Sequence, residues 1–343
     1  MPISRRKALL FSLGGGAALG LGTLTAGRCS FRADPDPGEL AAVSRTAWAL
    51  GSDVSMTVAG LPRPAAERAL DAAFAELETV EQVMSLYRPD SQICRLNRTG
   101  ELRDPHPYLL EVLRHAEATS RRTFGAFDIT VQPLWELYST AKREGRLPTN
   151  DELAVARAKV GWWGVECCWD SVVRLSGPGQ QITLNGVAQG FAADRAVAAL
   201  ARHGVEHALV NAGEIGAHGG KPTGEPWTIG IQHPRAADSY VSLAGLADRS
   251  LSTSGDYETS FTDDFRKHHI FDPRTGDSPP ELASVSIVAP TALEADALST
   301  AAMVLGVERT LQLVARSPGV DALLVTKSGR TIASAGFPEF STT

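Results

Sequence analysis

The chain has 343 residues, with 33 lysines and arginines against 39 aspartates and glutamates, a formal net charge of −6 and 43% hydrophobic residues. These proportions are globular and exclude disordered, collagen-like and coiled-coil proteins, while the length allows one large domain or two intimately packed lobes. The acidic balance argues against a nucleic-acid-binding protein, whose binding surface is basic.

Residues 1–28 are predicted to be an export signal. The run Ser4–Leu10 contains two adjacent arginines and a lysine and resembles a twin-arginine motif, and Ala8–Ala26 carries no charge. An uncleaved membrane anchor is the alternative, although the glycines in this stretch favour removal. Removal would change the formal net charge from −6 to −10. We therefore expect an exported, periplasmic or cell-envelope protein, membrane-anchored if the signal is uncleaved.

The first half of the remaining chain is predicted to be mainly helical. Residues 29–46 are expected to form a linker, because they contain Pro and Gly punctuation and no hydrophobic period. The expected elements after it are a strand-like region at 48–58 around Gly51, a helix from Pro64 that ends before Tyr87, a helix at 108–121, and a helix at 150–158 capped by Asn150.

The second half mixes helices and strands without strict alternation. The expected helices are 188–203, closed by Gly204, then 291–305 and 307–315, and the expected strands are 208–211, 227–232, 240–243, 284–288, 321–326 and 331–335. This order predicts an α+β fold rather than a repeated βαβ pattern.

Two acidic positions and a histidine pair are candidates for chemistry. Asp296 and Thr300 lie four residues apart on a predicted helix, so their oxygens share one face and suit Mg²⁺; a solvated acid and a backbone-bonded threonine are the alternative. Asp128 suggests either an anchored turn or an acceptor for ligand N–H groups. His268-His269 has no further zinc ligands at suitable spacing, which leaves a proton acceptor or a structural role.

Two loops with small and polar residues suit the approach of a polar ligand. They are 211–216, after an apolar strand, and 252–257, where hydroxyls surround Gly255. An ordinary turn is the alternative for each. Neither is a Walker A loop or a dinucleotide-binding glycine fingerprint, so the usual nucleotide-binding motifs are excluded.

Seven sequence blocks, taken in order, resemble the ApbE family, the FAD:protein FMN transferases. The blocks are Leu50-Gly51-Ser52, Ser85-Leu86-Tyr87 with Asp90-Ser91 and Leu96-Asn97, Gly125–Thr130, Asn185–Gly190, Ser254–Glu258, His269–Gly276 and Ala295–Thr300. They span nearly all of the chain after the linker, so the resemblance implies one ApbE-like domain over 47–340, with mixed sheets and packed helices.

The resemblance implies an enzyme that cleaves FAD with Mg²⁺, attaches FMN through a phosphoester to a Ser or Thr of an acceptor flavoprotein, and releases AMP. It places the metal between the backbone carbonyl of Gly186 and the side chains of Asp296 and Thr300. His269 would help to activate the acceptor hydroxyl. The implied FAD-binding positions are Leu50, Tyr87, Ala126, Phe127, Asp128, Thr183, Gln189 and Ile270.

Several positions depart from the family pattern. Leu50 replaces a usual Met, and Ala212-Gly213-Glu214 replaces a frequent Gly-Gly-Asp. Gln189 replaces a usual Lys and Thr183 a frequent Asp, and we interpret these two as the joint loss of one interacting pair. An FAD pyrophosphatase that releases FMN and AMP, or a non-catalytic FAD carrier, are therefore the alternatives. The expected acceptor is a membrane-bound or exported flavoprotein, such as a NosR-like protein.

Overall fold

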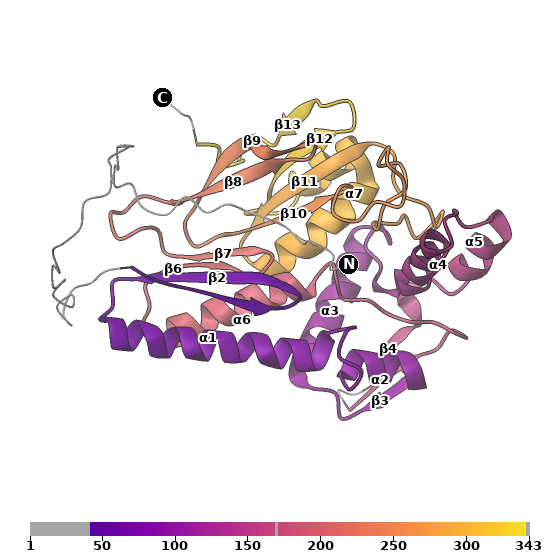
Figure 1. Cartoon of the computed structure of the whole chain (residues 1–343), viewed down its shortest axis with the longest axis horizontal. Helices are drawn as coiled ribbons and strands as arrows, with labels where there is room; N and C mark the ends of the chain where they lie inside the picture. Colours follow the sequence, from indigo (N-terminus) through magenta and orange to yellow (C-terminus); the bar gives the residue numbers. More distant parts are fainter. Residues whose placement is uncertain (1–41, 169–170, 341–343) are drawn as a thin grey trace, which may run out of the picture.

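The computed structural model describes residues 42–168 and 171–340 (Figure 1). The predicted signal peptide and residues 29–41 of the predicted linker lie outside them. Within the described ranges, no helix combines the length and the apolar character needed to cross a membrane.

A central sheet of eight antiparallel strands runs through the molecule, in the order β1-β2-β6-β7-β10-β11-β12-β13. Its strands are β1 (Val43–Ala49), β2 (Ser52–Ala59), β6 (His207–Asn211), β7 (Ile215–His218), β10 (Ser250–Gly255), β11 (Leu282–Ala289), β12 (Asp321–Thr326) and β13 (Thr331–Ala333). Helices packed on an antiparallel sheet make the fold α+β, as predicted, and strands from both halves of the chain belong to this one sheet.

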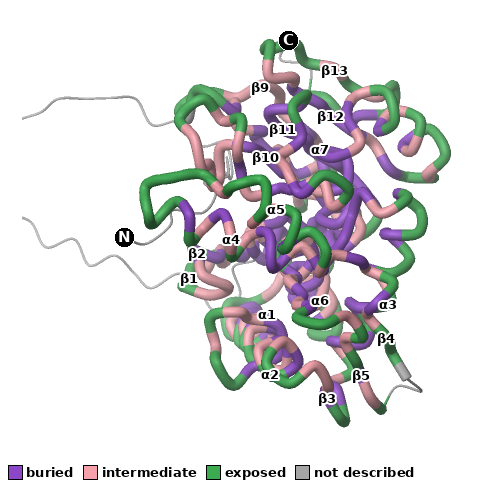
Figure 2. Tube along the Cα trace, turned by 90° about the vertical axis from the view of Figure 1, so that its right-hand side faces the viewer, coloured by how far each residue is buried: buried purple, intermediate pink, exposed green. Residues whose placement is uncertain are grey.

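Helices cover one face of this sheet, and a separate hairpin covers the other. The helices against the sheet are α1 (Arg63–Met84), α6 (Ala188–Arg202) and α7 (Ala292–Val314), and α3 (Pro107–Arg122) packs on α1 and α7. The hairpin is β8 (Trp227–His233) with β9 (Ala236–Leu246). In β11, Val285 and Ile287 pack in the α7 cluster, whereas Val288 packs with the hairpin. A strand covered on both faces is buried along its whole length, as β11 is. Figure 2 shows the buried positions concentrated along α7 and the strands beside it.

Shorter elements extend the fold beyond α1 and α3 (Figure 1). They are α2 (Gln92–Thr99), the 3-10 helix η1 (Ile129–Val131), α4 (Gln132–Arg143), α5 (Asn150–Arg157), the 3-10 helix η2 (Trp162–Gly164), and a small sheet of β3 (Glu101–Arg103), β5 (Val172–Leu175) and β4 (Val165–Cys168).

Helices α6 and α7 meet at a glycine and an aspartate. A Cβ on Gly190 would stand 2.2 Å from the carbonyl oxygen of Ala292, so only glycine allows this approach. One turn later, Asp194 accepts hydrogen bonds from the backbone N–H groups of Ala292 and Leu293 at 2.7 and 2.8 Å, at the N-terminus of α7. These contacts fix the start of α7 and with it the position of Asp296.

The Asp194 carboxyl should make stability depend on pH. Burial raises the pKa of Asp194 from 3.8 to about 6, although the two backbone N–H groups act in the opposite direction. The folded state therefore binds this proton more tightly than the unfolded chain. The resulting stabilisation is fully present below pH 3.8 and is lost as the pH rises through about 6. The free energy of unfolding of the wild type minus that of Asp194→Asn should therefore be larger at pH 4.5 than at pH 7. Urea unfolding of both proteins at both pH values measures this quantity. The same value at the two pH values would contradict the raised pKa of Asp194.

Most of the predicted helices and strands are present, with shifted ends. The expected linker, 29–46, is too long, because β1 already begins at Val43. Every second residue of β1 is exposed, and the polar residues in this strand hide the hydrophobic pattern that would have predicted it. Thr149 rather than Asn150 caps α5, in a capping box with Glu152. The two helices predicted around 306 meet at a kink, where Gly306 has a φ of 76°. Elements α2, α4, β3, β4, β5, β7 and β10 were not predicted.

Candidate functional site

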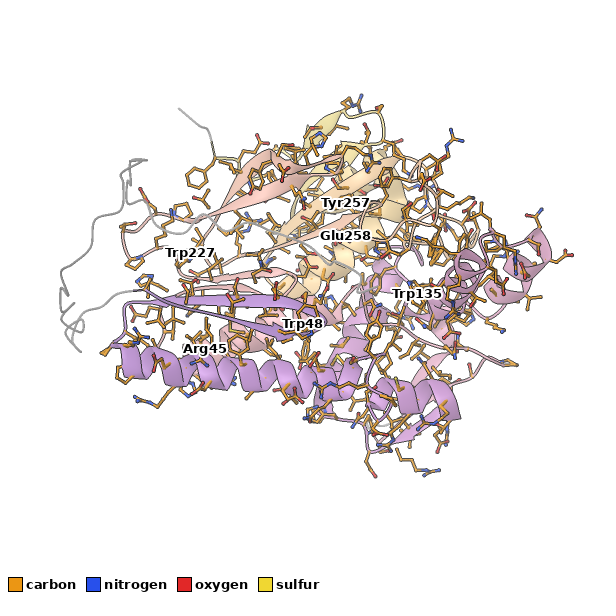
Figure 3. All side chains as sticks on the ribbon, in the orientation of Figure 1. Arg45, Trp48, Trp135, Trp227, Tyr257 and Glu258 are labelled. Carbon is orange, nitrogen blue, oxygen red and sulfur yellow. The ribbon has the colours of Figure 1, made fainter. Side chains whose placement is uncertain are left out.

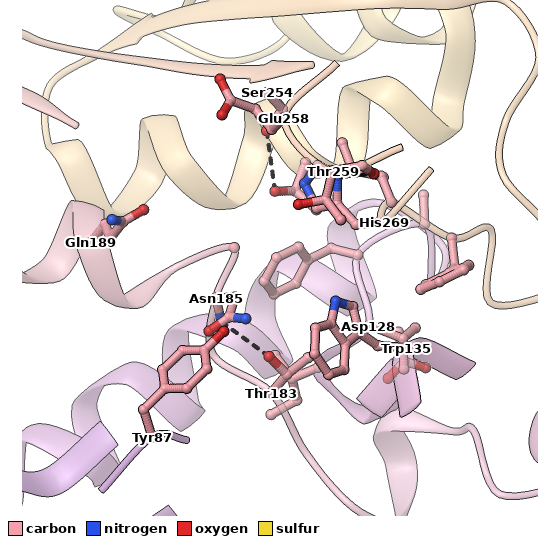
Figure 4. A pocket seen from close by; sticks show the side chains of 18 residues that line it. Tyr87, Asp128, Trp135, Thr183, Asn185, Gln189, Ser254, Glu258, Thr259 and His269 are labelled. Carbon is pink, nitrogen blue, oxygen red and sulfur yellow. Dashed lines mark hydrogen bonds between the residues drawn. The ribbon is translucent and has the colours of Figure 1, made fainter. Parts of the chain in front are cut away.

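A pocket lies where the end of β10, the first half of α7, the segment before α6 and the region around η1 and α4 come together (Figure 4). Its lining residues are Tyr87, Ala126, Phe127, Asp128, Ile129, Val131, Trp135, Thr183, Asn185, Gly186, Gln189, Ser254, Glu258, Thr259, His269, Ile270, Phe271 and Thr300. Apolar and aromatic side chains thus share the pocket with hydroxyl, amide, carboxylate and imidazole groups.

The structure brings nearly all of the predicted site residues together. Those that line the pocket are Tyr87, Ala126, Phe127, Asp128, Thr183, Gly186, Gln189, His269, Ile270 and Thr300. Leu50 lines an adjoining hollow that shares Tyr87, Asn185 and Gln189 with the pocket. Asp296 lies one turn before Thr300 on α7 and is only 1% exposed.

The predicted oxygen donors are Gly186 and Thr300, which line one side of the pocket, and Asp296, which lies one turn before Thr300 on α7. A Cβ on Gly186 would stand 2.8 Å from the Thr300 hydroxyl, so the backbone there lies directly against this side chain. Asp296 accepts a hydrogen bond from the Gly190 N–H at 3.0 Å, and the Ser254 hydroxyl lies 3.4 Å from that of Thr300. A carboxylate, a hydroxyl and a carbonyl suit a hard cation such as Mg²⁺.

This donor set contains one carboxylate only. Across the described part of the chain, no group of three or more His, Cys, Asp and Glu side chains could hold a metal ion. A cation held by Gly186, Asp296 and Thr300 would therefore take its remaining ligands from water or from phosphate oxygens, as Mg²⁺ commonly does.

Asp128 is anchored by its own turn. Its Oδ1 accepts hydrogen bonds from the Thr130 backbone N–H and hydroxyl at 2.8 and 2.6 Å, and its Oδ2 accepts one from the Trp162 N–H at 3.0 Å. Burial raises the pKa of Asp128, although these bonds act in the opposite direction. The interpretation as an anchored turn is thus confirmed, and contact with FAD stays a prediction.

The two adjacent histidines have different surroundings. His268 is fully buried, and burial together with the nearby Lys327 charge lowers its pKa to about 4, so it is neutral and structural. His269 lines the pocket: its backbone N–H donates to the Thr259 carbonyl at 3.0 Å, and its ring Nδ1 lies 3.3 Å from the same oxygen. In the tautomer with the proton on Nδ1, this bond orients the ring.

Leu50 occupies the tight turn of the β1–β2 hairpin. Leu50 and Gly51 have positive φ values of 53° and 76°, and the first is unfavourable for leucine. The Leu50 N–H donates to Glu81 at 2.8 Å, and the same carboxylate accepts from Arg88 at 2.6 Å. These contacts hold the turn beside the pocket.

Among the residues that the structure describes, no lining side chain of the pocket is permanently cationic. None of its 18 lining residues is lysine or arginine, whereas Asp128 and Glu258 both lie there. The Gln189 amide packs over Gly213, where a Cβ would stand 2.5 Å from Nε2. The Thr183 hydroxyl accepts from the Asn185 N–H at 3.3 Å. Figure 4 shows Gln189 and Thr183 apart, with Asn185 between them in this view.

Trp135 and Thr259 were not predicted as site residues. Figure 3 shows Trp135, a residue of α4, and Glu258, which follows the end of β10, on segments far apart in sequence. Thr259 follows Glu258 and supplies the carbonyl that His269 contacts. Glu258 belongs to the Ser254–Glu258 block, which could have indicated it, but no motif contains Trp135 or Thr259.

Comparison with known proteins gives consistent matches over most of the chain. The model of the ApbE family matches residues 50–324. The FAD:protein FMN transferase of Treponema pallidum (strain Nichols) is 34% identical over 298 residues, which cover 80% of this chain and 82% of that protein. The protein of the same name from Escherichia coli (strain K12) is 32% identical over 279 residues, with coverage of 77% and 78%.

Solved structures share the fold. The apo form of the flavinyl transferase ApbE from Pseudomonas stutzeri superposes with a TM-score of 0.75 at 30% identity, over 86% of this chain and 95% of that chain. The flavin transferase ApbE from Vibrio cholerae gives a TM-score of 0.76 at 27% identity, over 87% and 98%. With the family model matching most of the chain, these relatives show that it belongs to the ApbE family.

Proposed function

We propose that this chain is an FAD:protein FMN transferase, which cleaves FAD, attaches FMN through a phosphoester to a Ser or Thr of an acceptor flavoprotein, and releases AMP. The observation that carries the proposal is that Gly186 and Thr300 line the pocket that also contains His269, with Asp296 one turn before Thr300 on α7. Family membership and the names of the relatives support it.

Gly186, Asp296 and Thr300 would hold Mg²⁺ through a carbonyl, a carboxylate and a hydroxyl oxygen. When bound, Mg²⁺ supplies positive charge that neutralises the pyrophosphate during phosphoryl transfer. The contact from the Gly190 N–H to Asp296 orients the carboxylate, and the Ser252 and Ser254 hydroxyls, which contact Ser299 at 3.1 and 2.8 Å, fix this part of α7 against β10.

His269 would accept the proton of the attacking hydroxyl. Its ring is oriented by the Thr259 carbonyl, and it is half-buried at the pocket wall. General base catalysis requires such a group within reach of the hydroxyl. The aromatic and apolar side chains of the pocket, such as Phe127 and Ile270, would bind a ring of the dinucleotide and exclude water from it.

The acceptor follows from the proposed reaction and from the amino-terminal sequence. We expect an exported or membrane-bound flavoprotein with an accessible Ser or Thr, a NosR-like protein being one candidate, and we expect the reaction to take place in the periplasm or cell envelope. Detection of the native chain in a periplasmic fraction, with loss of export when Arg5 and Arg6 are both replaced by lysine, tests this localisation.

Restoring a cation in the pocket should tighten FAD binding. In the double variant Gln189→Lys with Thr183→Asp, the lysine can contact a phosphate oxygen, and the aspartate restores the local charge balance. One charge-assisted hydrogen bond is worth about 1.5 kcal/mol, so the dissociation constant should fall about tenfold. Fluorescence titration with FAD at low ionic strength measures the change. If Lys and Asp were lost as a pair, Gln189→Lys alone should tighten FAD binding less than the double variant does. The same FAD affinity in the single variant, the double variant and the wild type would contradict this interpretation.

Incubation with FAD, Mg²⁺ and an acceptor domain tests the proposed function. Transfer predicts AMP and a covalently flavinylated acceptor in equal amounts. AMP without a labelled acceptor would instead indicate the pyrophosphatase, and FAD binding without either product would indicate the carrier.

A further inference from the structure

One long irregular segment supplies a large part of the pocket wall. Its pocket-lining members are Glu258, Thr259, His269, Ile270 and Phe271. Residues 256–281, all of which the structure describes, contain no helix or strand and only one isolated bridge, between Ser260 and His268. The shape of this wall must therefore come from side-chain contacts with other parts of the fold.

One of these contacts is an ion pair between a buried aspartate and a part-exposed arginine at the start of the segment. Asp256 follows β10 directly, and its side chain is fully buried. Arg235, at the tip of the β8–β9 hairpin, donates to Asp256 Oδ1 and Oδ2 at 2.6 and 2.8 Å. A bidentate guanidinium contact fixes both the position and the plane of a carboxylate.

Two further groups complete this cluster. The Arg235 guanidinium lies 4.3 Å from the centre of the Phe265 ring, in the same irregular segment. Lys327, in the turn between β12 and β13, lies 3.6 Å from Asp256 and donates to the Phe265 carbonyl at 2.8 Å. Arg235 and Lys327 thus join the hairpin tip and an edge of the main sheet to both ends of the loop 256–265.

The cluster is three residues from the carbonyl that orients His269. Asp256 is followed by Tyr257 and Glu258 and then by Thr259, whose carbonyl accepts from the His269 backbone and lies 3.3 Å from its ring. The bridge between Ser260 and His268 places these two stretches side by side. Displacement of Asp256 would therefore move the Thr259 carbonyl and, with it, the imidazole.

We propose that Arg235 is a positioning residue for the transfer reaction: its bidentate pair with Asp256 holds the loop 256–259 so that the Thr259 carbonyl orients His269. This inference rests on the proposed transferase function. Arg235 itself does not line the pocket, so it should affect the rate of transfer and leave the binding of FAD unchanged. If Arg235 contributed only to global stability, its replacement would not lower the rate of transfer while leaving FAD binding unchanged.

The test compares Arg235→Lys with the wild type in the full-length exported protein. Lysine keeps the positive charge next to the buried Asp256 but lacks the planar fork. We expect kcat for transfer to fall about tenfold, since catalysis depends steeply on the orientation of the base. We expect the dissociation constant of FAD with Mg²⁺ to change less than about twofold, because no pocket contact is lost.

Arg249→Lys provides a matched control at the opposite end of β10. Arg249 donates to Asp321 at 2.8 Å and is exposed to a similar degree, 27% against 31% for Arg235, but Asp321 is not in the irregular segment. This variant should keep wild-type values of kcat and FAD affinity.

Amide hydrogen exchange gives a readout that does not depend on activity. In Arg235→Lys, peptides that cover 256–271 should exchange at least about tenfold faster than in the wild type and in the control. Wild-type kcat together with wild-type exchange would overturn the inference, and so would equal losses in kcat and FAD affinity. If the wild type itself transfers no flavin, the proposed function fails, and unchanged exchange in Arg235→Lys would separately overturn the positioning role.

Discussion

Replacing Asp296 with alanine should abolish AMP release and flavin transfer together, with a loss of about 10³-fold or more in rate. Asp296 is the only carboxylate in the proposed donor set, so its removal leaves two neutral oxygens, which bind a divalent cation weakly. Activity assays over a range of Mg²⁺ concentrations, combined with calorimetric titration of Mg²⁺ in the presence of FAD, measure both consequences.

Two companion variants separate metal binding from folding. Alanine leaves the buried Gly190 N–H without its acceptor, at a cost of about 1–3 kcal/mol in the free energy of unfolding, whereas Asp296→Asn retains an acceptor oxygen. Glu294→Ala, on the same helix, removes a surface ion pair with Arg122 and should keep full activity. Wild-type AMP release by Asp296→Asn would exclude the proposed metal site.

Replacing His269 with alanine should slow flavin transfer by about 10²–10⁴-fold and leave FAD bound. The loss follows from removal of the group that accepts the proton of the attacking hydroxyl, since the alanine variant keeps the donor set on α7. Single-turnover transfer to an acceptor domain and fluorescence titration with FAD measure the two quantities separately.

His203→Ala is the matched histidine control. His203 lies at the far end of α6, where its Nδ1 is 3.0 Å from the Ala199 carbonyl, and the variant should transfer flavin at the wild-type rate. If the His269 variant were equally fast, the imidazole would have no part in proton transfer. If it lost FAD as well, the role of His269 would be binding.

Those parts of the fold that follow a clear hydrophobic period could be predicted from the sequence. Helices α1 and α6 show apolar positions at helical spacing, and Gly204 and Gly306 mark helix ends through positive φ values of 77° and 76°. The spacing of Asp296 and Thr300 likewise predicts two candidate site residues on one face of the helix that the structure shows as α7.

Strand β10 could not be predicted, because its buried face is polar. Ser252 and Ser254 are buried and hydrogen-bond with Ser299 on α7, so the strand shows hydroxyls where a buried strand usually shows aliphatic side chains. From sequence alone such a pattern is indistinguishable from a turn. The polar face is used at the site, since the Ser254 hydroxyl also lies 3.4 Å from that of Thr300.

Other site residues depend on contacts between distant segments. Trp135 enters the pocket because α4 packs there, and Thr259 is placed by the bridge between Ser260 and His268 and by the pair of Arg235 with Asp256. Arg235 and Asp256 are 21 residues apart and belong to no common motif. Local periodicity contains no information on such pairs.

The central claim is most directly tested by a single reaction, in which residues 30–343 are incubated with FAD, Mg²⁺ and purified acceptor domains that contain a candidate Ser or Thr. The measurement is the ratio of released AMP to covalently bound FMN on the acceptor, from chromatography and from flavin fluorescence on a denaturing gel. We predict a ratio of about one. We also expect that neither AMP nor covalent FMN forms when a chelator is added or when Asp296 is replaced by asparagine. Release of AMP with no covalent flavin on any acceptor would contradict the transferase.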